Sequence, residues 1–493
     1  MGKLKDTIAE IRAREQEEGR MSLKEYISYG VSRFGFGTVG KMYEGYQMPF
    51  YASIGIPINI AGVMIAIIRF WDLFNDPAIA TIIDTEKYGI KKRGKFTRWL
   101  SPMVPALTIT AIVMFINPPG SLWVKVVWLM VLNIIWEAVS TFTGISFQSM
   151  QAVMSADLQE RSSYLTFGNL GDKLVGALPG IIPIAFDFLV RGSETRTPLL
   201  RESSFYTLFA VVLCSIGGIA AMFSKNLKER VFSQKQDKHL WESLLTFLRN
   251  KQLLLLWTAN LTNFISAAGW AAAPFFFKDA VGNFSVQTLV WTLTGTPTFL
   301  VMLLSPLFLK RFSPRKVVIF NKILNAACMF AMFFVCSAVG YASTAGIVFI
   351  ILFNLIASIP SGVSDVANNV CTINTFDYTE WQTGDRAEAT TFMISGMLNK
   401  GINGLGPLIA GVLMARAGFV SGEGVVLSQA TKDSLFLFYT VFQGLGMLLS
   451  VIPYFFYKIE GPLLDQVQAE LAERRKGVNS EAADEEFMQE ERT

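Results

Sequence analysis

The sequence predicts an all-α protein that crosses a membrane many times. Of its 493 residues, 52% are hydrophobic and 17% are charged, whereas about a quarter of the residues in soluble domains are charged. One helical crossing needs about 20 mostly apolar residues, and we count twelve runs of that kind. The runs are residues 27–53, 55–83, 100–117, 121–155, 163–190, 204–224, 249–277, 285–309, 316–340, 343–376, 388–418 and 432–457.

The basic residues of the short loops predict how these spans are oriented, because cytoplasmic loops carry an excess of Lys and Arg. Residues 84–98 contain six basic side chains, and residues 310–316 are also basic. The connections 51–55 and 117–121 carry no charge, although 191–202 departs from this alternation with three Arg. We therefore expect both termini in the cytoplasm, which agrees with an even number of spans.

A long polar loop predicts that the spans form two six-helix halves. Each half has a basic turn after its second span, and such a weak internal repeat is typical of secondary transporters. The predicted parts are a cytoplasmic N-terminal tail (1–24), an N-terminal half (25–225), a cytoplasmic central loop (226–248), a C-terminal half (249–458) and an acidic cytoplasmic C-terminal tail (459–493).

The sequence contains no motif of a soluble enzyme or of a nucleic-acid-binding module. GFGTVG at 35–40 has the glycine rhythm of a dinucleotide-binding loop, but it begins an apolar helix and follows no strand. The four cysteines lie inside apolar runs without the spacing of metal ligands, and His239 is the one histidine. We expect no enzymatic activity, no cofactor and no nucleic-acid partner, and a chain surrounded by a lipid bilayer.

Charged residues near the end of the second run are candidates for function, because an ionisable group inside a span costs a few kcal/mol. Asp72 and Asp76 lie one helical turn apart, and hence on one face, with Arg69 three residues before Asp72. With Asn75 as a neutral oxygen donor, this face could take up a monovalent cation or a proton. The alternative is an Arg–Asp lock that neutralises itself, with Asp76 capping a helix that restarts at Pro77.

Further charges lie inside the apolar runs. Lys400 is deep in FMISGMLNKGINGLGPLIAG (392–411), whose small residues allow close helix packing. We expect Lys400 to bind a substrate or to pair with an acid. The other candidates are Arg33, Glu137, Asp172 and Asp365, together with Lys41, Glu44 and Lys173, which lie closer to span ends and are interpreted as snorkelling or locally paired residues.

Two motifs in order resemble those of a known family. RFWDLFNDPAIATIID (69–84) is followed by KRGKFTRWL, and FDYTEWQTGDRAEAT (376–390) is followed by Lys400. YGVSRFG at 29–35 and SADLQERSSY at 155–164 also fit. The chain thus resembles the glycoside–pentoside–hexuronide:cation symporters, the family of melibiose permease, over about residues 22–460. The resemblance implies a major facilitator fold in the cell (inner) membrane that moves a small glycoside with a cation by alternating access.

The resemblance also implies roles for individual residues. Asp72 and Asp76 match the carboxylates that bind the coupling cation, here expected to be Na⁺, and Asn75 lies beside them. Lys400 matches a lysine placed near both cation and sugar. The gating residues that it implies are Arg69, Lys95 in the basic turn 91–98, and Asp377, Glu380, Gly384 and Arg386 in the loop 377–386.

The substrate site departs from the family's pattern. Two sugar-binding aspartates of the family fall on Gly37 and Gly144, an arginine on Asn169, and tryptophans on Gln148 and Asp365. Because polar groups at a site reject ligands that leave them unpaired, this changed set predicts a changed ligand. Arg33, Lys173 and Lys400 would suit an anionic sugar, such as a uronide or a sulfonated sugar.

We therefore predict a secondary active transporter that carries a sugar or glycoside, including an anionic one, together with Na⁺. One alternative keeps the fold but carries a non-sugar amphipathic solute or uses H⁺. A more remote alternative is a membrane receptor that transports nothing. Because no histidine lies in a span, a coupling proton would need a carboxylate of raised pKa, which favours sodium.

Overall fold

All the regular elements in the described part of the chain are helical. The computed structural model describes residues 20–85, 94–155, 164, 167–168, 170–172, 174–175, 180–191, 198–230, 251–383, 388–422, 424–471 and 473. The helices are α2 (Leu23–Ser53), α3 (Ile58–Thr85), α4 (Lys95–Met114), α5 (Leu122–Val153), α7 (Ile181–Phe186), η2 (Asp187–Arg191), α8 (Glu202–Ala221), η3 (Met222–Asn226), α10 (Lys251–Thr262), α11 (Phe264–Phe275), η4 (Phe276–Val281), α12 (Ser285–Leu303), α13 (Ser305–Leu309), α14 (Pro314–Val339), α15 (Thr344–Ser358), α16 (Ser361–Thr383), α17 (Glu388–Arg416), α18 (Gln429–Leu437), η5 (Phe438–Phe442), α19 (Gln443–Val451) and η6 (Ile452–Phe456). Each predicted apolar run coincides, at least in part, with one or more of these helices.

Seven stretches of helix among the described residues are long and apolar enough to cross a membrane. They are Ile58–Ile83, Phe96–Met114, Leu122–Gln151, Glu202–Asn226, Pro314–Val339, Thr344–Gln382 and Gln429–Phe456. The stretch from Thr344 contains a break between α15 and α16 at Pro360, where proline removes a backbone donor. The polytopic character of the chain is thus confirmed, while the number of twelve spans stays a prediction.

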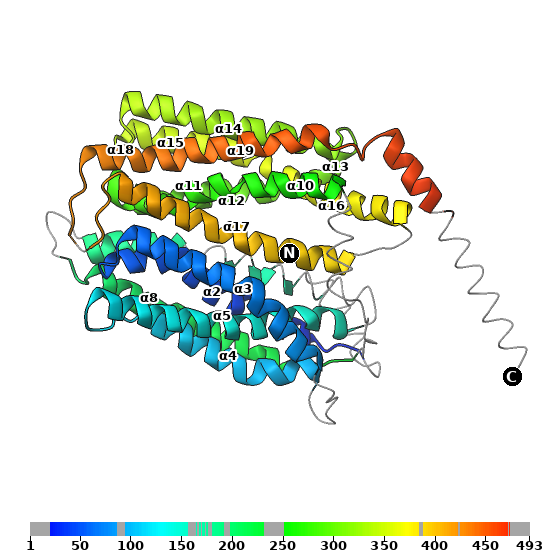
Figure 1. The fold of residues 1–493 in the computed structure, drawn as a ribbon, viewed down its shortest axis with the longest axis horizontal. Coiled ribbons are helices and arrows are strands. Elements are labelled where there is room, and N and C mark those ends of the chain that lie inside the picture. The colour runs from blue at the N-terminus through cyan, green and yellow to red at the C-terminus, as the bar shows by residue number, and fades with distance from the viewer. Residues whose placement is uncertain are drawn as a thin grey trace, which may run out of the picture. The chain divides into compact units, whose positions relative to one another are not determined.

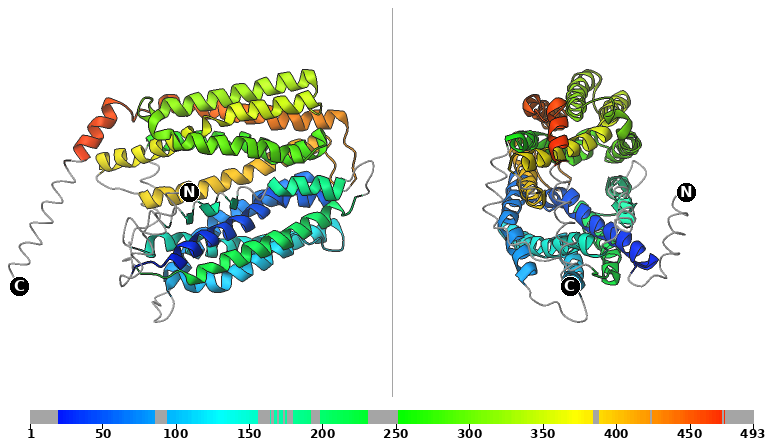
Figure 2. Two further views of the ribbon diagram at one scale, coloured as in Figure 1. Left: turned by 180° about the vertical axis from the view of Figure 1, so that it is seen from behind. Right: turned by 90° about the vertical axis from the view of Figure 1, so that its right-hand side faces the viewer.

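The chain divides into two compact units. The first comprises Met1–Gln236, Ala268–Thr292 and Asn403–Tyr439, and the second comprises the rest. In the first unit α2 packs on α8, α4 packs on α5 and α8, and α3 packs on α5 (Figure 1). In the second unit α14 packs on α15, α16 and α19, and α14 and α15 run side by side (Figures 1 and 2). The predicted division into halves at 226–248 stays a prediction.

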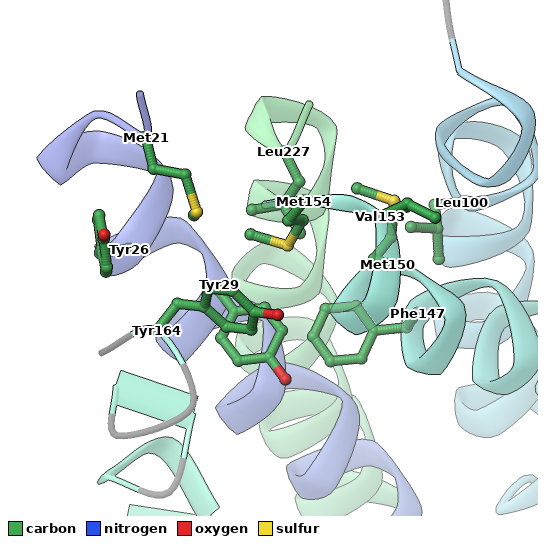
Figure 3. Close-up of a cluster of buried hydrophobic side chains, with 10 residues drawn as sticks. All are labelled: Met21, Tyr26, Tyr29, Leu100, Phe147, Met150, Val153, Met154, Tyr164 and Leu227. Atoms are coloured by element: carbon green, nitrogen blue, oxygen red, sulfur yellow. The ribbon is translucent and has the colours of Figure 1, made fainter. Parts of the chain in front are cut away.

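A cluster of buried aromatic and aliphatic side chains forms part of the core of the first unit (Figure 3). Tyr29 of α2 stacks on Phe147 of α5 with ring centroids 5.3 Å apart, and it meets Tyr164 edge-on at 5.2 Å. Around them gather Met21, Tyr26, Leu100, Met150, Val153, Met154 and Leu227. The cluster fixes α2 against α5, and these two helices also supply most of the site described below.

Small residues let α2 and α8 approach each other closely. A Cβ atom added at Gly35 would lie 2.3 Å from the backbone nitrogen of Ala221 and 2.4 Å from the carbonyl oxygen of Gly217. These are backbone atoms, which cannot move aside as a flexible side chain can. Gly35 is therefore required by packing, as is usual for small residues at helix contacts in membrane proteins.

We expect the Gly35→Ala variant to lose stability, because one added methyl group overpacks the α2–α8 contact, at a cost of about 1–3 kcal/mol. Gly45→Ala is the matched control, since Gly45 lies on the same helix and a Cβ there meets nothing within 4 Å. The control should be neutral or gain about 0.5–1 kcal/mol from the better helix propensity of alanine. Thermal unfolding of the two purified variants measures this, and equal midpoints would contradict the packing argument.

Candidate functional site

A cavity of about 230 Å³ in the first unit gathers several positions that the sequence predicts for substrate binding. Gly37 on α2 and Gly144 and Gln148 on α5 all line it. The other lining residues are Arg33, Phe36, Gly40, Leu107, Trp136, Ser140, Thr143, Phe147 and Asp172. Residues that are far apart in the sequence thus face one space.

The absence of side chains at the glycine positions helps to make this cavity. A Cβ atom at Gly144 or at Gly40 would meet nothing within 4 Å, so these positions open space. The walls combine aromatic rings, from Phe36, Trp136 and Phe147, with hydroxyl and amide groups. Apolar walls with a few placed polar groups are typical of small-molecule sites.

The charged residues lining the cavity are one cation and one acid. Arg33 Nε on α2 lies 2.7 Å from Asp172 Oδ2, and the two side chains are 32% and 44% exposed. The sequence identified both residues as charges within spans, but their pairing depends on how α2 packs against the segment of Asp172. An arginine in this position presents further guanidinium N–H groups, which can bind a carboxylate or sulfonate.

A second group of polar residues joins α3 to α5, and we call Asp72, Asn75, Asp76 and Thr141 the oxygen cluster. Thr141 Oγ1 donates a hydrogen bond to Asp76 Oδ1 at 2.7 Å and accepts one from Asn75 Nδ2 at 3.3 Å. Asp72 is completely buried, and Asn75 and Thr141 are 9% and 6% exposed. The spacing of one helical turn predicted that the α3 residues share a face. Thr141 could not be predicted from the sequence, because a threonine in an apolar helix gives no distinctive signal.

The guanidinium of Arg69 lies beside the oxygen cluster, between two acids. Its Nη1 atom is 3.2 Å from Glu137 Oε1 on α5 and 3.8 Å from Asp72 Oδ2. Its Cζ atom lies 5.7 Å from the ring centre of Tyr43, a cation–π contact. The predicted Arg–Asp pair is therefore present, but Arg69 is shared. The helix restart at Pro77, which belonged to the alternative interpretation, does not occur, because α3 runs without interruption through that residue.

Helix α17 packs closely against α3, as its glycine content predicted. A Cβ atom at Gly404 would lie 2.6 Å from Arg69 Cβ, and one at Gly411 would lie 2.5 Å from the carbonyl oxygen of Ile58. The residues of α17 that touch α3 therefore have to be glycine at these two points.

Other predicted site residues belong to the second unit or lie outside the described part of the chain. Lys400 on α17 and Asp377 and Glu380 on α16 are half-buried in the second unit. Asp365, also on α16, interacts electrostatically with Lys322. Their proposed roles stay predictions. The side chain of Lys95 and the residues Asn169, Lys173, Gly384 and Arg386 lie outside the described part of the chain.

A separate group of charges joins α8, η2 and η4. Lys278 Nζ donates a hydrogen bond to Glu202 Oε1 at 2.6 Å and lies 3.6 Å from Asp279 Oδ1. The guanidinium of Arg191 donates to the backbone carbonyl of Lys278. Asp279 Oδ2 is buried and has no hydrogen-bond partner among the described residues. None of these four residues lines the cavity at Arg33, and we interpret the group as structural.

Apolar helices with a polar cavity and buried carboxylates are typical of membrane transporters. The solved structure of a D-xylose-proton symporter has the same fold, with a TM-score of 0.56 and 13% identity over 87% of this chain and 96% of that one. This chain belongs to the family of MFS/sugar transport proteins, which it matches over residues 28–461. It is therefore a multi-pass protein of the cell membrane and a transporter, not an enzyme, and the resemblance of its motifs to the symporter family is confirmed.

Two relatives match nearly the whole chain. An uncharacterized symporter of Bacillus subtilis, YjmB, is 27% identical over 480 residues, covering 93% of this chain and 96% of that protein. A putative sulfoquinovose importer of Salmonella typhimurium is 24% identical over 472 residues, covering 93% of this chain and 95% of that protein.

The charge group at Lys278 predicts a pH-dependent stability. Asp279 follows the predicted span 249–277, and burial raises its pKa to about 6 from an ordinary value of 3.8, with Lys278 opposing the shift. Since the folded pKa exceeds the unfolded one, the folded state is favoured below about pH 4, and this stability is lost as the pH rises through about 6. At pH 7.5 the ionised carboxylate costs up to about 3 kcal/mol.

We therefore expect Asp279→Asn to unfold at a higher temperature than the unmodified protein at pH 7.5, with the difference shrinking toward pH 4.5. Parallel thermal unfolding at pH 4.5, 6 and 7.5 measures it. A difference that stays constant over this range would show that burial of the charge is not its cause.

Proposed function

We propose that this transporter carries an anionic sugar in symport with Na⁺. Two arrangements support the proposal: the oxygen cluster between α3 and α5, and Arg33 in the wall of the cavity. The observation that carries it is the hydrogen bond of Thr141 to Asp76 beside the buried Asp72, because it gathers hard oxygen donors from two helices at one point.

The oxygen cluster suits a small hard cation. Carboxylate, amide and hydroxyl oxygens are the ligands that such ions prefer, and Asp72, Asn75, Asp76 and Thr141 supply all three kinds. Two carboxylates, Asp72 and Asp76, lie one helical turn apart on α3, and a bound monovalent cation offsets part of their negative charge. An ion pair between Arg69 and an aspartate with only a structural role would need one carboxylate, not two.

The cavity suits one sugar ring with an acidic group. Its volume of about 230 Å³ is below the range of about 300–1,000 Å³ that is typical for drug-sized ligands. Aromatic faces such as that of Trp136 can pack against the C–H face of a sugar, while Ser140, Thr143 and Gln148 can bond to its hydroxyls. The guanidinium of Arg33 can bind a carboxylate or sulfonate through charge-assisted hydrogen bonds.

The similarity to the putative sulfoquinovose importer supports this assignment, since sulfoquinovose is a sugar with a sulfonate group. The same cavity holds the glycines at 37 and 144 where the resembling family has aspartates. Removing two acids and presenting an arginine changes the site in the direction that favours an anion.

The mechanism that we propose begins with the cation. Na⁺ binds between Asp72 and Asp76 and neutralises part of their charge, and the sugar then binds in the cavity with its acidic group on Arg33. Only the doubly loaded transporter changes between its outward and inward states, which makes the sodium gradient drive uptake of the sugar.

We expect sodium to raise the thermal stability of the purified protein and Asp76→Asn to abolish this rise. A ligand that binds only the folded state stabilises it by about 2.7 kcal/mol at a hundredfold excess over its Kd. Choline replaces sodium at constant ionic strength, and Asp465→Asn is the control, since it removes an exposed acid outside the oxygen cluster. A thermal stability that depends on pH but not on sodium would instead favour H⁺ coupling. A thermal stability that depends on neither would refute a cation site at Asp72 and Asp76.

The substrate assignment predicts that Arg33→Gln loses uptake of sulfoquinovose driven by a sodium gradient. Hydrogen bonds to charged groups contribute about 1.5–3 kcal/mol, so the apparent affinity should fall roughly ten- to a hundredfold. Asp172→Asn, which frees the guanidinium, should retain uptake. Glucuronate should compete with the labelled sulfonate, and glucose should not. Wild-type uptake in Arg33→Gln, or equal competition by glucose, would contradict an anionic substrate.

A further inference from the structure

We propose that Glu137 controls the affinity of the cation site by giving Arg69 a second position. When the site is empty, the guanidinium of Arg69 stays near Asp72 and takes the place of the missing cation. When the cation binds, the guanidinium withdraws to Glu137. The inference rests on the proposed cation site at Asp72 and Asp76, and goes beyond it by assigning a positioning role to an acid outside the oxygen cluster.

The distances place Arg69 between these two acids. One and the same atom, Nη1, is 3.2 Å from Glu137 Oε1, which is hydrogen-bond distance, and 3.8 Å from Asp72 Oδ2. The side chains of Asp72 and Glu137 are 0% and 3% exposed, and that of Arg69 is 16% exposed. Water therefore contributes little to the solvation of either acid, and the guanidinium is shared by both.

The register of α3 and α5 places the contact between Arg69 and Glu137 next to the oxygen cluster. Glu137 and Thr141 are four residues apart on α5, and Arg69, Asp72 and Asp76 recur at helical spacing on α3, so each set lies on one face. Thr141 contacts Asp76, and one turn along α5 Glu137 contacts Arg69. The guanidinium thus lies at the edge of the proposed cation site and not inside it.

A hydrogen-bonded network holds Glu137 in place. The hydroxyl of Tyr43 lies 3.1 Å from Glu137 Oε1 and 2.8 Å from Asn133 Oδ1, and it can donate its one hydrogen to either oxygen. Gln47 Nε2 donates to Asn133 Oδ1 at 2.5 Å and to the hydroxyl of Tyr51 at 2.9 Å. With Glu137 anchored in this way, the long side chain of Arg69 is the part that can move.

Electrostatics gives the direction of the effect. A guanidinium that stays beside Asp72 repels an incoming cation, and the repulsion between like charges is strong away from water. Glu137 offers the guanidinium another partner, so that binding of the cation leaves no unpaired buried charge, which would be costly. Without Glu137, Arg69 loses the acid to which it is hydrogen-bonded and is held more strongly at Asp72, where it opposes the cation.

The test is sodium titration of thermal stability on the full-length protein, with choline balancing the ionic strength. We expect Glu137→Gln to raise the sodium concentration for half-maximal stabilisation by about tenfold. Glu137→Asp keeps the charge but moves the carboxylate back by one methylene from a partner now at 3.2 Å, and should shift the titration in the same direction by a smaller amount. Glu137→Asp therefore also tests the proposal if Glu137→Gln does not fold. Asp465→Asn removes an exposed acid that belongs neither to the oxygen cluster nor to the surroundings of Arg69, and as the control it should titrate like the wild type.

The Arg69→Gln variant tests whether Glu137 acts through Arg69 or through its own negative charge on the cation. In the Arg69→Gln background, Glu137→Gln should produce no further weakening, because there is no guanidinium left to hold. An equal shift in both backgrounds, or a wild-type titration for both Glu137 variants, would overturn this inference alone. Absence of any sodium response in the wild type would overturn the proposed cation site as well, so the two failures are distinguishable.

Discussion

The burial of charged side chains between α3 and α5 is the constraint on which the rest of this structure depends. Asp72 and Glu137 are almost fully enclosed, and a buried charge is tolerated only when it is paired or bonded. Arg69 satisfies part of this requirement from α3, and Tyr43 supplies a hydroxyl from α2. The three helices are therefore held at a fixed register, and moving any of them by one residue would leave a carboxylate without its partner.

Helix α5 connects this polar contact to the cavity through pairs of adjacent residues. Trp136 lines the cavity while Glu137 contacts Arg69, and Ser140 lines the cavity while Thr141 bonds to Asp76. Neighbouring residues of a helix point about 100° apart, so α5 presents one face to the cavity and another to α3. A rotation of α5 moves both faces together. The ring of Tyr43, 4.7 Å from that of Trp136, adds a direct contact between the two regions.

The sequence allowed the fold class and part of the site to be predicted, and the reason differs for each part. Apolar runs of membrane-spanning length define helices locally, and the interval of four between Asp72 and Asp76 places them on one face whatever surrounds them. The partners Thr141 and Glu137 could not be derived, because the register of α3 on α5 depends on tertiary packing. The family resemblance found Gly37, Gly144 and Gln148, which line one cavity, whereas the roles of Lys400 and Asp365 are still predictions.

The contact of Gly404 with Arg69 has a consequence for hydration. With no side chain at this point, α17 lies directly on the aliphatic stem of Arg69 and seals that side of the polar contact. Attraction between charges strengthens as water is excluded, so the ion pairs of Arg69 are strongest while α17 is in place. Lifting the helix by the thickness of a water layer would hydrate the guanidinium and its acids, and would weaken their attraction without any change in the residues themselves.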